Sequence, residues 1–351
     1  MRCLAILTVR NEGAFLLEWL AHHRAVGFTD FLIFSNDCQD GTDAMLDHLQ
    51  DMGELVHHRN DGPYDKRGIQ FTALKAAEKI DLVQQADWIL PLDVDEFVNI
   101  HAGNGTLPAL LAVLPDATAI TLTWRLFGNA GVETYDDIPV LQTFTRCAPV
   151  AMFWPWRSAM FKTLYKNDGT YAKVGVHRPR NPDKSRLAAA RWYDGEGRLL
   201  SDQFKTKRVF SDYGRSNYKY VQLNHYPLGA KQSYVLKADR GRAVHGDDVL
   251  GLDYWVERNF NTDEDTSIHR MAARAAPHLH RYFEDPTLAH LHANAAAWRK
   301  ARFDELMLQD AYRALYGRLL MTPETQPTTR EQSRMLVNYG LRARAQNGDA
   351  P

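Results

Sequence analysis

The sequence predicts an α/β fold in which a mixed, mostly parallel sheet is flanked by helices, with a helical C-terminal extension. Two observations predict the sheet. Short apolar runs alternate with amphipathic stretches over the first half of the chain, and the connections between them are short and rich in turn-forming residues. Ligands of such sheets bind beyond the carboxyl ends of the strands, so functional residues are expected in the loops that follow the apolar runs.

The first half of the chain contains these elements in order. Leu4–Val9 is an apolar run that predicts a strand, and Ala14–Val26 carries apolar side chains near one face of a helix. The loops 10–13, 35–41 and 93–99 follow predicted strands and should meet at one edge of the sheet. The remaining elements are predicted as strands over Phe31–Phe34, Glu54–His57 and Trp88–Leu92, and as helices over Thr42–Met52 and residues 68–85.

The pattern changes after residue 118, where predicted strands are separated by long polar loops, and again near residue 231, where the chain becomes helical in character. We therefore expect one domain over 1–230, with halves 1–118 and 119–230, a helical region over 231–321, and a Pro/Thr-rich linker with a polar tail over 322–351. The later strands are predicted at Ala119–Leu126, Ala159–Leu164, Ala172–Val176 and Tyr218–Asn224, and the helices at Gln232–Arg242, Leu252–Asn259, Ile268–Ala275 and 286–318.

Composition limits the classes of function. A hydrophobic fraction of 45% and a charged fraction of 24% in 351 residues are those of an ordinary globular protein. The formal net charge of −1 offers no attraction for nucleic acid, which we do not expect as a partner. Three widely spaced cysteines and the lack of a stretch like a signal peptide or membrane span predict a cytoplasmic location. Peripheral contact with the inner face of the membrane is compatible with these observations.

Asp-Val-Asp-Glu-Phe at 93–97 is the most informative stretch of the chain. It follows the apolar run Trp88–Leu92, and the alternation of sides relaxes where a strand ends, so Asp93 and Asp95 can turn toward one point beyond the sheet. Two carboxylates at such a point suit Mg²⁺ or Mn²⁺, which keep positions open for water and substrate phosphates. A surface turn rich in acids is the alternative interpretation.

Three motifs in this order resemble those of glycosyltransferases of the GT-A fold, in the broad family 2 group: Thr8–Glu12, Gln39–Thr42 and Asp93–Phe97. Further pieces over residues 1–245 are similar to family 92 and its bacterial relatives: Leu17-Glu18-Trp19, His22-His23, Gly175–Pro179, Leu223–Tyr226 and Ser233-Tyr234 with Lys237. The resemblance implies a Rossmann-like domain whose first half binds a nucleotide and whose second half binds the acceptor. It also implies transfer from a nucleotide-diphospho-sugar, a UDP-sugar being expected first, to a glycan or lipid-linked acceptor, with inversion, as in polysaccharide biosynthesis.

The resemblance implies a divalent ion, Mn²⁺ or Mg²⁺, that bridges the donor's diphosphate as a Lewis acid and template. Asp95 is the expected direct ligand, and Asp93 contacts the ion through water or holds the ribose. Glu96 has either of these roles or orders the loop. His177 and His225 are candidate further ligands because neutral imidazole suits Mn²⁺, and a structural role is the alternative for each.

The donor's nucleoside is expected at the ends of the first two strands. Many family 2 members have a Val-Asp-Asp run after the second strand, where this chain has Phe34-Ser35-Asn36, so the identity of the base stays open. Arg67 precedes a helix whose N-terminal end favours anions and is a candidate clamp for a phosphate, with Gln70 one turn further on. A solvated turn is the alternative for Arg67. The residues expected to cradle the nucleoside are Thr8, Arg10, Asn11, Glu12, Asn36 and Asp37.

An inverting transferase also needs a base that deprotonates the acceptor hydroxyl. Asp247, Asp248 and Asp253 are candidates, Glu96 is a further catalytic candidate, and the sequence does not choose among them. Asp253 could instead be an acid that stabilises a helix N-terminus. Trp154-Pro155-Trp156-Arg157 carries two indoles that suit either stacking on an acceptor sugar or plugging the core below a loop.

Two other classes of function compete with a glycosyltransferase. A phosphatase of the haloacid dehalogenase type also has Asp-x-Asp after an apolar strand, but on its first strand and followed by Thr or Val where this chain has Phe97. A non-catalytic protein of the same fold that binds a nucleotide or a sugar is the second alternative. Release of inorganic phosphate from phosphomonoesters would favour the phosphatase.

Overall fold

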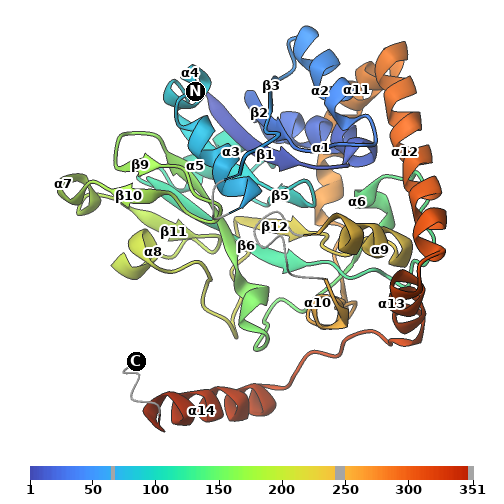
Figure 1. Cartoon of the computed structure of the whole chain (residues 1–351). Coiled ribbons are helices and arrows are strands. Elements are labelled where there is room, and N and C mark those ends of the chain that lie inside the picture. Colours follow the sequence, from blue (N-terminus) through green and yellow to red (C-terminus); the bar gives the residue numbers. More distant parts are fainter. Residues whose placement is uncertain (65–67, 242–249, 347–351) are drawn as a thin grey trace.

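The computed structural model describes residues 1–64, 68–241 and 250–346, and it confirms a mixed α/β fold with C-terminal helices (Figure 1). Several strands of the second half lie in the same sheet as those of the first. The division into two halves at residue 118 stays a prediction. In the described part of the chain, the main sheet has nine strands. Eight follow one another as β3 (Val56–Arg59), β2 (Asp30–Ser35), β1 (Cys3–Val9), β4 (Trp88–Leu92), β8 (Phe161–Lys166), β6 (Ala119–Leu126), β12 (Val221–His225) and β5 (Glu96–Ile100), and β11 (Trp192–Asp194) pairs with β6.

The strand directions bring the ends of four strands to one edge. β1 is parallel to β2 and β4, β8 is antiparallel to both β4 and β6, and β12 is parallel to β6. The two reversals around β8 cancel, so β12 ends at the same edge as β4. β5 is antiparallel to β12 and starts at this edge, where Glu96 is opposite His225. The topology therefore places His225 next to the turn that carries Asp93 and Asp95.

The first half follows the prediction, with two differences. Residues 96–99 were expected in a loop, but Glu96 starts β5, because the backbone of this segment pairs with β12 and all its side chains are buried. The helix predicted over 68–85 is broken, because Ile80 has an extended backbone and packs against the core. The helices here are α1 (Gly13–Val26), α2 (Thr42–Asp51), α3 (Ile69–Ala77), α4 (Asp81–Gln84) and α5 (Leu107–Val113).

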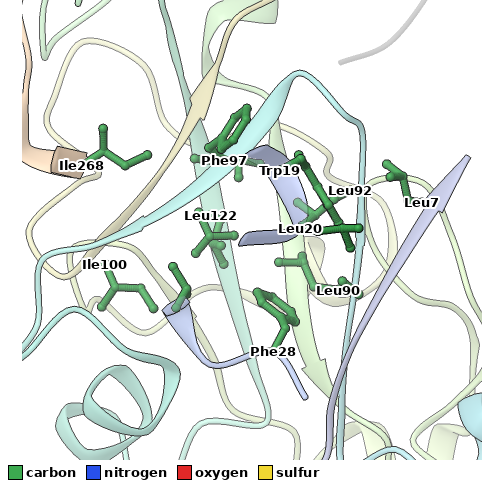
Figure 2. Close-up of a cluster of buried hydrophobic side chains, with 14 of the residues drawn as sticks. Leu7, Trp19, Leu20, Phe28, Leu90, Leu92, Phe97, Ile100, Leu122 and Ile268 are labelled. Carbon is green, nitrogen blue, oxygen red and sulfur yellow. The ribbon is translucent and has the colours of Figure 1, made fainter. Parts of the chain in front are cut away.

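Hydrophobic side chains cover both faces of the sheet. The alternation along β1 places Ala5 and Leu7 on the face covered by α1 and α2, and Leu4 and Ile6 on the face covered by α3. Figure 2 shows the first of these clusters, in which Trp19 of α1 lies near strand residues such as Leu92 and Phe97. The indole of Trp19 also donates a hydrogen bond of 3.0 Å to the Glu96 carbonyl. The core thus supports the strand ends that carry the acidic turn.

The second half contains short elements between its long strands. Two small antiparallel pairs lie outside the main sheet: β9 (Tyr171–Lys173) with β10 (Arg180–Pro182), and β7 (Arg146–Cys147) with β13 (Asp263–Glu264), which follows β12 in the chain. The prediction of a strand over Ala172–Val176 corresponds to a shorter strand that begins one residue earlier. The elements are α6 (Val140–Thr143), β7 (Arg146–Cys147), η1 (Trp156–Ala159), β9 (Tyr171–Lys173), β10 (Arg180–Pro182), α7 (Lys184–Leu187), α8 (Asp202–Thr206) and β13 (Asp263–Glu264).

Helices dominate the chain after β12. The long α12 (Pro286–Met307) starts at an N-cap, where the Asp285 carboxylate accepts hydrogen bonds from the Thr287 and Leu288 N–H groups. It packs against α1, α2 and α9 (Lys231–Arg240). The tail expected after the linker forms α14, which lies apart from the body of the molecule in Figure 1. No helix in the described part of the chain is long and apolar enough to cross a bilayer. These elements are α9 (Lys231–Arg240), α10 (Leu252–Val256), η2 (Ser267–Met271), α11 (Ala272–Glu284), α12 (Pro286–Met307), α13 (Asp310–Met321) and α14 (Arg330–Gln346).

Candidate active site

The acids Asp93 and Asp95 lie in a tight turn between β4 and β5. The Asp93 carbonyl accepts a hydrogen bond of 3.0 Å from the Glu96 N–H, which closes the turn, and the Asp95 carbonyl accepts one of 2.8 Å from the Tyr226 N–H. The turn is therefore anchored to the residue after β12 as well as to its own strands. Both side chains keep some exposure, 37% for Asp93 and 23% for Asp95.

Asp93 is held from the sheet side of the turn. Its Oδ1 accepts a hydrogen bond of 2.9 Å from Gln70 Nε2, and its Oδ2 accepts one of 2.9 Å from Lys162 Nζ. The Lys162 side chain lies on β8 and is fully buried. Burial by itself would lower the pKa of Lys162, but Asp93 and Glu96 outweigh burial and raise it, so this lysine stays charged.

Asp95 is held from the C-terminal part of the chain. Its Oδ2 accepts a hydrogen bond of 2.7 Å from Lys237 Nζ on α9, and its Oδ1 lies 3.7 Å from His225 Nε2. Lys237 also donates a hydrogen bond of 2.8 Å to the Pro227 carbonyl. Burial alone would raise the pKa of Asp95, but Lys237 and His225 hold it well below the usual range of an aspartate. Asp95 is therefore a carboxylate at every physiological pH.

Glu96 follows the two aspartates in the chain, and its side chain is fully buried. Its Oε1 accepts a hydrogen bond of 2.6 Å from Trp124 Nε1, its Oε2 accepts one of 2.9 Å from the Asp93 N–H, and Lys162 Nζ is 3.5 Å away. Burial raises the pKa of Glu96 to about 8 against the attraction of Lys162, and the charges of Asp93 and Asp95 add to the rise. When Glu96 is protonated and therefore neutral, the negative charges of Asp93 and Asp95 balance the positive charges of Lys162 and Lys237. The fully buried position suits the ordering of the turn.

His225 and His177 both pack against Trp124, with ring centroids 4.2 Å and 5.7 Å from the indole. His177 Nδ1 lies 3.0 Å from the Phe161 carbonyl, and burial together with the charge of Lys162 lowers the pKa of this histidine to about 4. Burial also lowers the pKa of His225, although the carboxylate beside it opposes this effect. Both imidazoles are thus neutral near pH 7, which is the form that binds a metal.

The fit of this site to a divalent ion depends on which side-chain atoms are free to coordinate it. Within the described part of the chain, no group of three or more His, Cys, Asp and Glu residues is placed to hold a metal ion. Asp95 and His225 nevertheless present an oxygen and a nitrogen 3.7 Å apart, while the oxygens of Asp93 are taken by other partners. Mg²⁺ and Mn²⁺ need only one or two protein ligands when phosphates and water complete their shell. The residues therefore fit an ion that arrives with a diphosphate.

The loop after β1 turns sharply at Asn11, whose φ of 55° is in the left-handed region that Asn tolerates well. Asn11 Oδ1 accepts a hydrogen bond of 2.7 Å from the Gln39 N–H, which joins this loop to the loop after β2. Glu12 forms an ion pair with Arg240 at the end of α9. Arg240 also donates a hydrogen bond of 3.0 Å to the Arg10 carbonyl. The end of α9 therefore closes over the first strand end.

The other expected nucleoside residues lie at the same edge. Thr8 is half-buried near the end of β1, and the Asn36 N–H donates a hydrogen bond of 3.1 Å to the Val9 carbonyl. Asn36 is almost fully buried, whereas Asp37 is exposed and accepts a hydrogen bond of 2.6 Å from the Tyr64 hydroxyl. The structure thus brings the ends of β1, β2 and β4 together as the sequence predicted.

Arg67, Asp247 and Asp248 are outside the described residues. Asp253 is exposed in the first turn of α10, the position of an acid that stabilises a helix N-terminus. Its role as a base stays a prediction.

Of the two indoles expected near the acceptor, that of Trp156 packs on the protein itself. Trp156 lies in η1 with its ring 5.4 Å from that of Phe210, and the Arg157 guanidinium lies 4.7 Å from the Trp156 ring. A cavity opens beside Asp95, and neither Trp154 nor Trp156 lines it. This packing suits the plug interpretation better than the platform.

Sequence reasoning missed the two lysines. Lys162 stands inside an apolar predicted strand, and a lysine at such a position has to find a buried acid, so this signal was available. Lys237 belongs to a motif that resembles family 92, but the sequence does not predict a function for it. Trp124 gave no signal, because an aromatic residue in a strand is ordinary. The cavity beside Asp95 and Lys237 has a volume of about 330 Å³.

Several solved structures have a low overall similarity to this chain. TarS of S. aureus has a TM-score of 0.34 at 11% identity, covering 81% of this chain and 44% of that one. TarS 1–349 in complex with UDP has a TM-score of 0.34 at 12% identity, covering 88% and 92%. Mannosyl-3-phosphoglycerate synthase from Rubrobacter xylanophilus has a TM-score of 0.28 at 14% identity, covering 48% of this chain and 53% of that one.

Curated plant proteins and one family profile are similar to this chain in sequence. A glycosyltransferase family 92 protein of Oryza sativa subsp. japonica is 29% identical over 129 residues, which are 35% of this chain and 21% of the relative. One of Ricinus communis is 30% identical over 98 residues, 27% of this chain and 16% of the relative. The matched segments thus span about a fifth of these relatives or less. The profile of glycosyltransferase family 92 matches residues 2–194, more than half of the 351 residues, and the chain therefore belongs to that family.

Proposed function

We propose that this protein is a metal-dependent glycosyltransferase. It would move a sugar from a nucleotide-diphospho-sugar, with a UDP-sugar as the first candidate, to a hydroxyl of a glycan or another acceptor, with inversion at C1. The observation that carries the proposal is the turn at the sheet edge, where Asp93 and Asp95 lie beside the loops that follow β1 and β2. Family membership and three unpaired cysteines support a sugar-transfer role in a reducing compartment such as the cytoplasm.

The donor would lie across this edge with its nucleoside on the side of Asp93. Asn36, Asp37 and the Arg10–Glu12 loop offer amide, carboxylate and backbone groups there for a base and a ribose. The diphosphate would reach toward Asp95, where the ammonium group of Lys237 is 2.7 Å from the carboxylate. A cation at this place favours a departing diphosphate, because the negative charge on the leaving group grows during transfer.

A divalent ion would be held by Asp95 and His225. When bound, it would supply Lewis-acid stabilisation of the leaving diphosphate. Two lysines already neutralise the two aspartates, so an ion alone gains little attraction from this cluster. The same ion gains much more when two phosphate groups enter with it. We therefore expect the metal and the nucleotide to bind together.

The other residues of the site would position these groups. Glu96 ties the turn to Trp124 and to the Asp93 backbone, so it keeps both aspartates in place. Trp124 in turn supports the ring of His225. Water is excluded on the sheet side, where Glu96, Lys162 and His225 are buried. Such a dry and rigid surrounding strengthens the electrostatic effect of each charged group.

The test measures the thermal midpoint of unfolding with Mn²⁺, with UDP and with both. We expect the pair to raise the midpoint by more than the sum of the single effects, since ligands that bind only the native state stabilise it. A screen of nucleotide sugars for Mn²⁺-dependent nucleotide release then identifies the donor. Equal stabilisation by UDP in Mn²⁺ and in EDTA would contradict the metal role. Phosphate release from phosphomonoesters without nucleotide binding would contradict the transferase.

A further inference from the structure

The helix α14 lies apart from the body of the molecule, and Thr325 ties the linker before it to that body (Figure 1). The Thr325 N–H donates a hydrogen bond of 3.0 Å to the Asn259 carbonyl, and the Thr325 hydroxyl donates one of 2.6 Å to the Val256 carbonyl. Among the described residues, no other helix or strand packs extensively against α14. This helix is therefore stabilised by its own sequence or by a partner.

The sequence defines where α14 begins. The Thr329 hydroxyl accepts a hydrogen bond of 3.2 Å from the Gln332 N–H, and Gln332 Oε1 accepts one of 2.9 Å from the Thr329 N–H. This reciprocal pair is a capping box, which satisfies two N–H groups at the start of a helix. Most of the stability of a protein helix, however, comes from the packing of its apolar face. A surface that covers one face of α14 would supply this stability.

One face of α14 carries large apolar side chains that are open to solvent. Met335 and Leu336 lie four and three residues before Tyr339, so the three side chains share a face of the helix. Their exposed fractions are 51%, 38% and 61%, and we call these three residues the apolar strip. The inward side of the helix is a different one, because Ser333 is 4% exposed and its hydroxyl lies 2.7 Å from that of Thr328.

The charged residues of α14 are mostly positive. The helix sequence contains four arginines and one glutamate, a formal charge of +3 in a chain whose net charge is −1. Counted over residues 326–351, which include Asp349, the formal charge is +2. Arg334 and Arg342 are exposed beside the apolar strip, and the Arg342 guanidinium lies 6.0 Å from the Tyr339 ring. The helix is thus amphipathic and basic.

A lipid surface fits both features better than a second copy of the chain does. A stable interface between proteins buries about 800 Å² on each partner. Three partly exposed side chains along one helix face cannot supply this area. The arginines of two copies of α14 would also repel each other if the helices paired. A bilayer surface needs only a shallow apolar face, and its anionic lipids attract the arginines that flank this face.

We propose that α14 lies on the surface of a bilayer that contains anionic lipids, with the apolar strip at the boundary between headgroups and acyl chains. Arg334 and Arg342 would bind lipid phosphates while their aliphatic stems stay beside the strip. This inference goes beyond the proposed transferase function and does not depend on it. It concerns the place where the protein is held and not the reaction that it performs.

The test measures the binding of the full chain to lipid vesicles by co-sedimentation. One set of vesicles is phosphatidylcholine, and the other is an equimolar mixture of phosphatidylcholine and phosphatidylglycerol. At low salt, we expect the partition coefficient to be at least about tenfold larger on the mixed vesicles. It should fall steeply in about 1 M salt, where the screening length is about 3 Å. Absence of binding, or equal binding to both kinds of vesicle, would overturn the proposal.

A first double variant tests the apolar strip without a change of charge. Leu336→Gln with Tyr339→Gln should lower the partition coefficient on mixed vesicles by about tenfold. The control, Val113→Gln with Leu199→Gln, replaces side chains that are 42% and 53% exposed elsewhere, and it should leave binding unchanged. Without vesicles, both variants should keep the thermal midpoint of the wild type, because all four positions are exposed. A lower midpoint in the α14 variant alone would mean that the strip packs within the protein, which contradicts the proposal.

A second double variant tests the charge of the helix. Arg334→Gln with Arg342→Gln should reduce the preference for mixed vesicles by about tenfold. The control, Arg274→Gln with Lys300→Gln, removes two exposed cations from α11 and α12 and should keep the preference. Equal losses in the two variants would mean that only the net charge of the protein matters, and the assignment to α14 would be wrong.

Light scattering distinguishes a lipid surface from a second copy. We expect the wild type and Leu336→Gln with Tyr339→Gln to have the same mass in solution. If the wild type is a dimer and the variant a monomer, a second copy covers the strip and the proposal is wrong. If UDP and Mn²⁺ do not bind while the preference for anionic vesicles persists, the proposed function fails and the membrane contact of α14 stands.

Discussion

Asp93 and Asp95 are two residues apart in one turn, yet their carboxylates have different hydrogen-bond partners. Asp93 is held by Gln70 and by a lysine inside the sheet, Lys162, whose side chain is fully buried. Asp95 is held by Lys237 from a C-terminal helix and lines the cavity. The comparison shows that Asp93 is held by side chains of the sheet and of α3, whereas Asp95 faces the cavity, where ligands would bind.

The largest expected effect separates the two acids by activity. Asp95→Asn should lower the rate of sugar transfer by about a thousandfold, which is roughly 4 kcal/mol, because it removes the carboxylate charge that, in the proposed function, would hold the metal at the diphosphate. Asp93→Asn should lower it less, by about tenfold, since this side chain already has two protein partners. Nucleotide release under saturating donor measures both. Equal losses in the two variants would show that the acids share one role.

The next effect separates the two lysines by stability. Lys162→Met should lower the free energy of unfolding by about 3 kcal/mol, because removal of one member of a buried ion pair leaves its partner unpaired. Lys237→Met should cost less stability, because its side chain is 20% exposed whereas that of Lys162 is fully buried. Urea denaturation measures both values. If Lys237→Met is more destabilising than Lys162→Met, the claim that Lys162 contributes more to stability is wrong.

A pH experiment tests whether Glu96, which follows Asp95 in the chain, is protonated in the folded protein. The pKa of Glu96 is raised to about 8 in the folded protein, so the native state holds a proton that the unfolded chain loses above about pH 4.5. Stability from this group is complete below pH 4.5 and is lost as the pH rises to about 8, by at most about 1.4 kcal/mol per pH unit. Glu96→Gln should flatten this decline.

The exposed Glu324→Gln serves as the control for this experiment and should leave the decline unchanged. Urea denaturation at several pH values between 4.5 and 8 compares both variants with the wild type. An unchanged slope in Glu96→Gln would mean that Glu96 is ionised in the folded protein. The charges of the turn would then not be balanced as described above.

Much of the frame was predictable, because local patterns carry it. The alternation of buried side chains along β1 predicted a strand, and the acids after Trp88–Leu92 were correctly expected at the sheet edge. β5 was not predicted, since Glu96 and Asn99 do not look like strand residues until β12 provides their hydrogen bonds. The break of the helix at Ile80 was also missed, because it depends on packing against the core.

The sequence by itself determined that two acids follow a buried strand, because hydrophobic periodicity and turn residues act over a few positions. Only the tertiary structure decided which lysine neutralises which acid, since Lys162 is 69 residues from Asp93 and Lys237 is 142 residues from Asp95. Such pairings depend on strand order and helix packing, and a charge has no preference for a distant partner until the fold brings the two together.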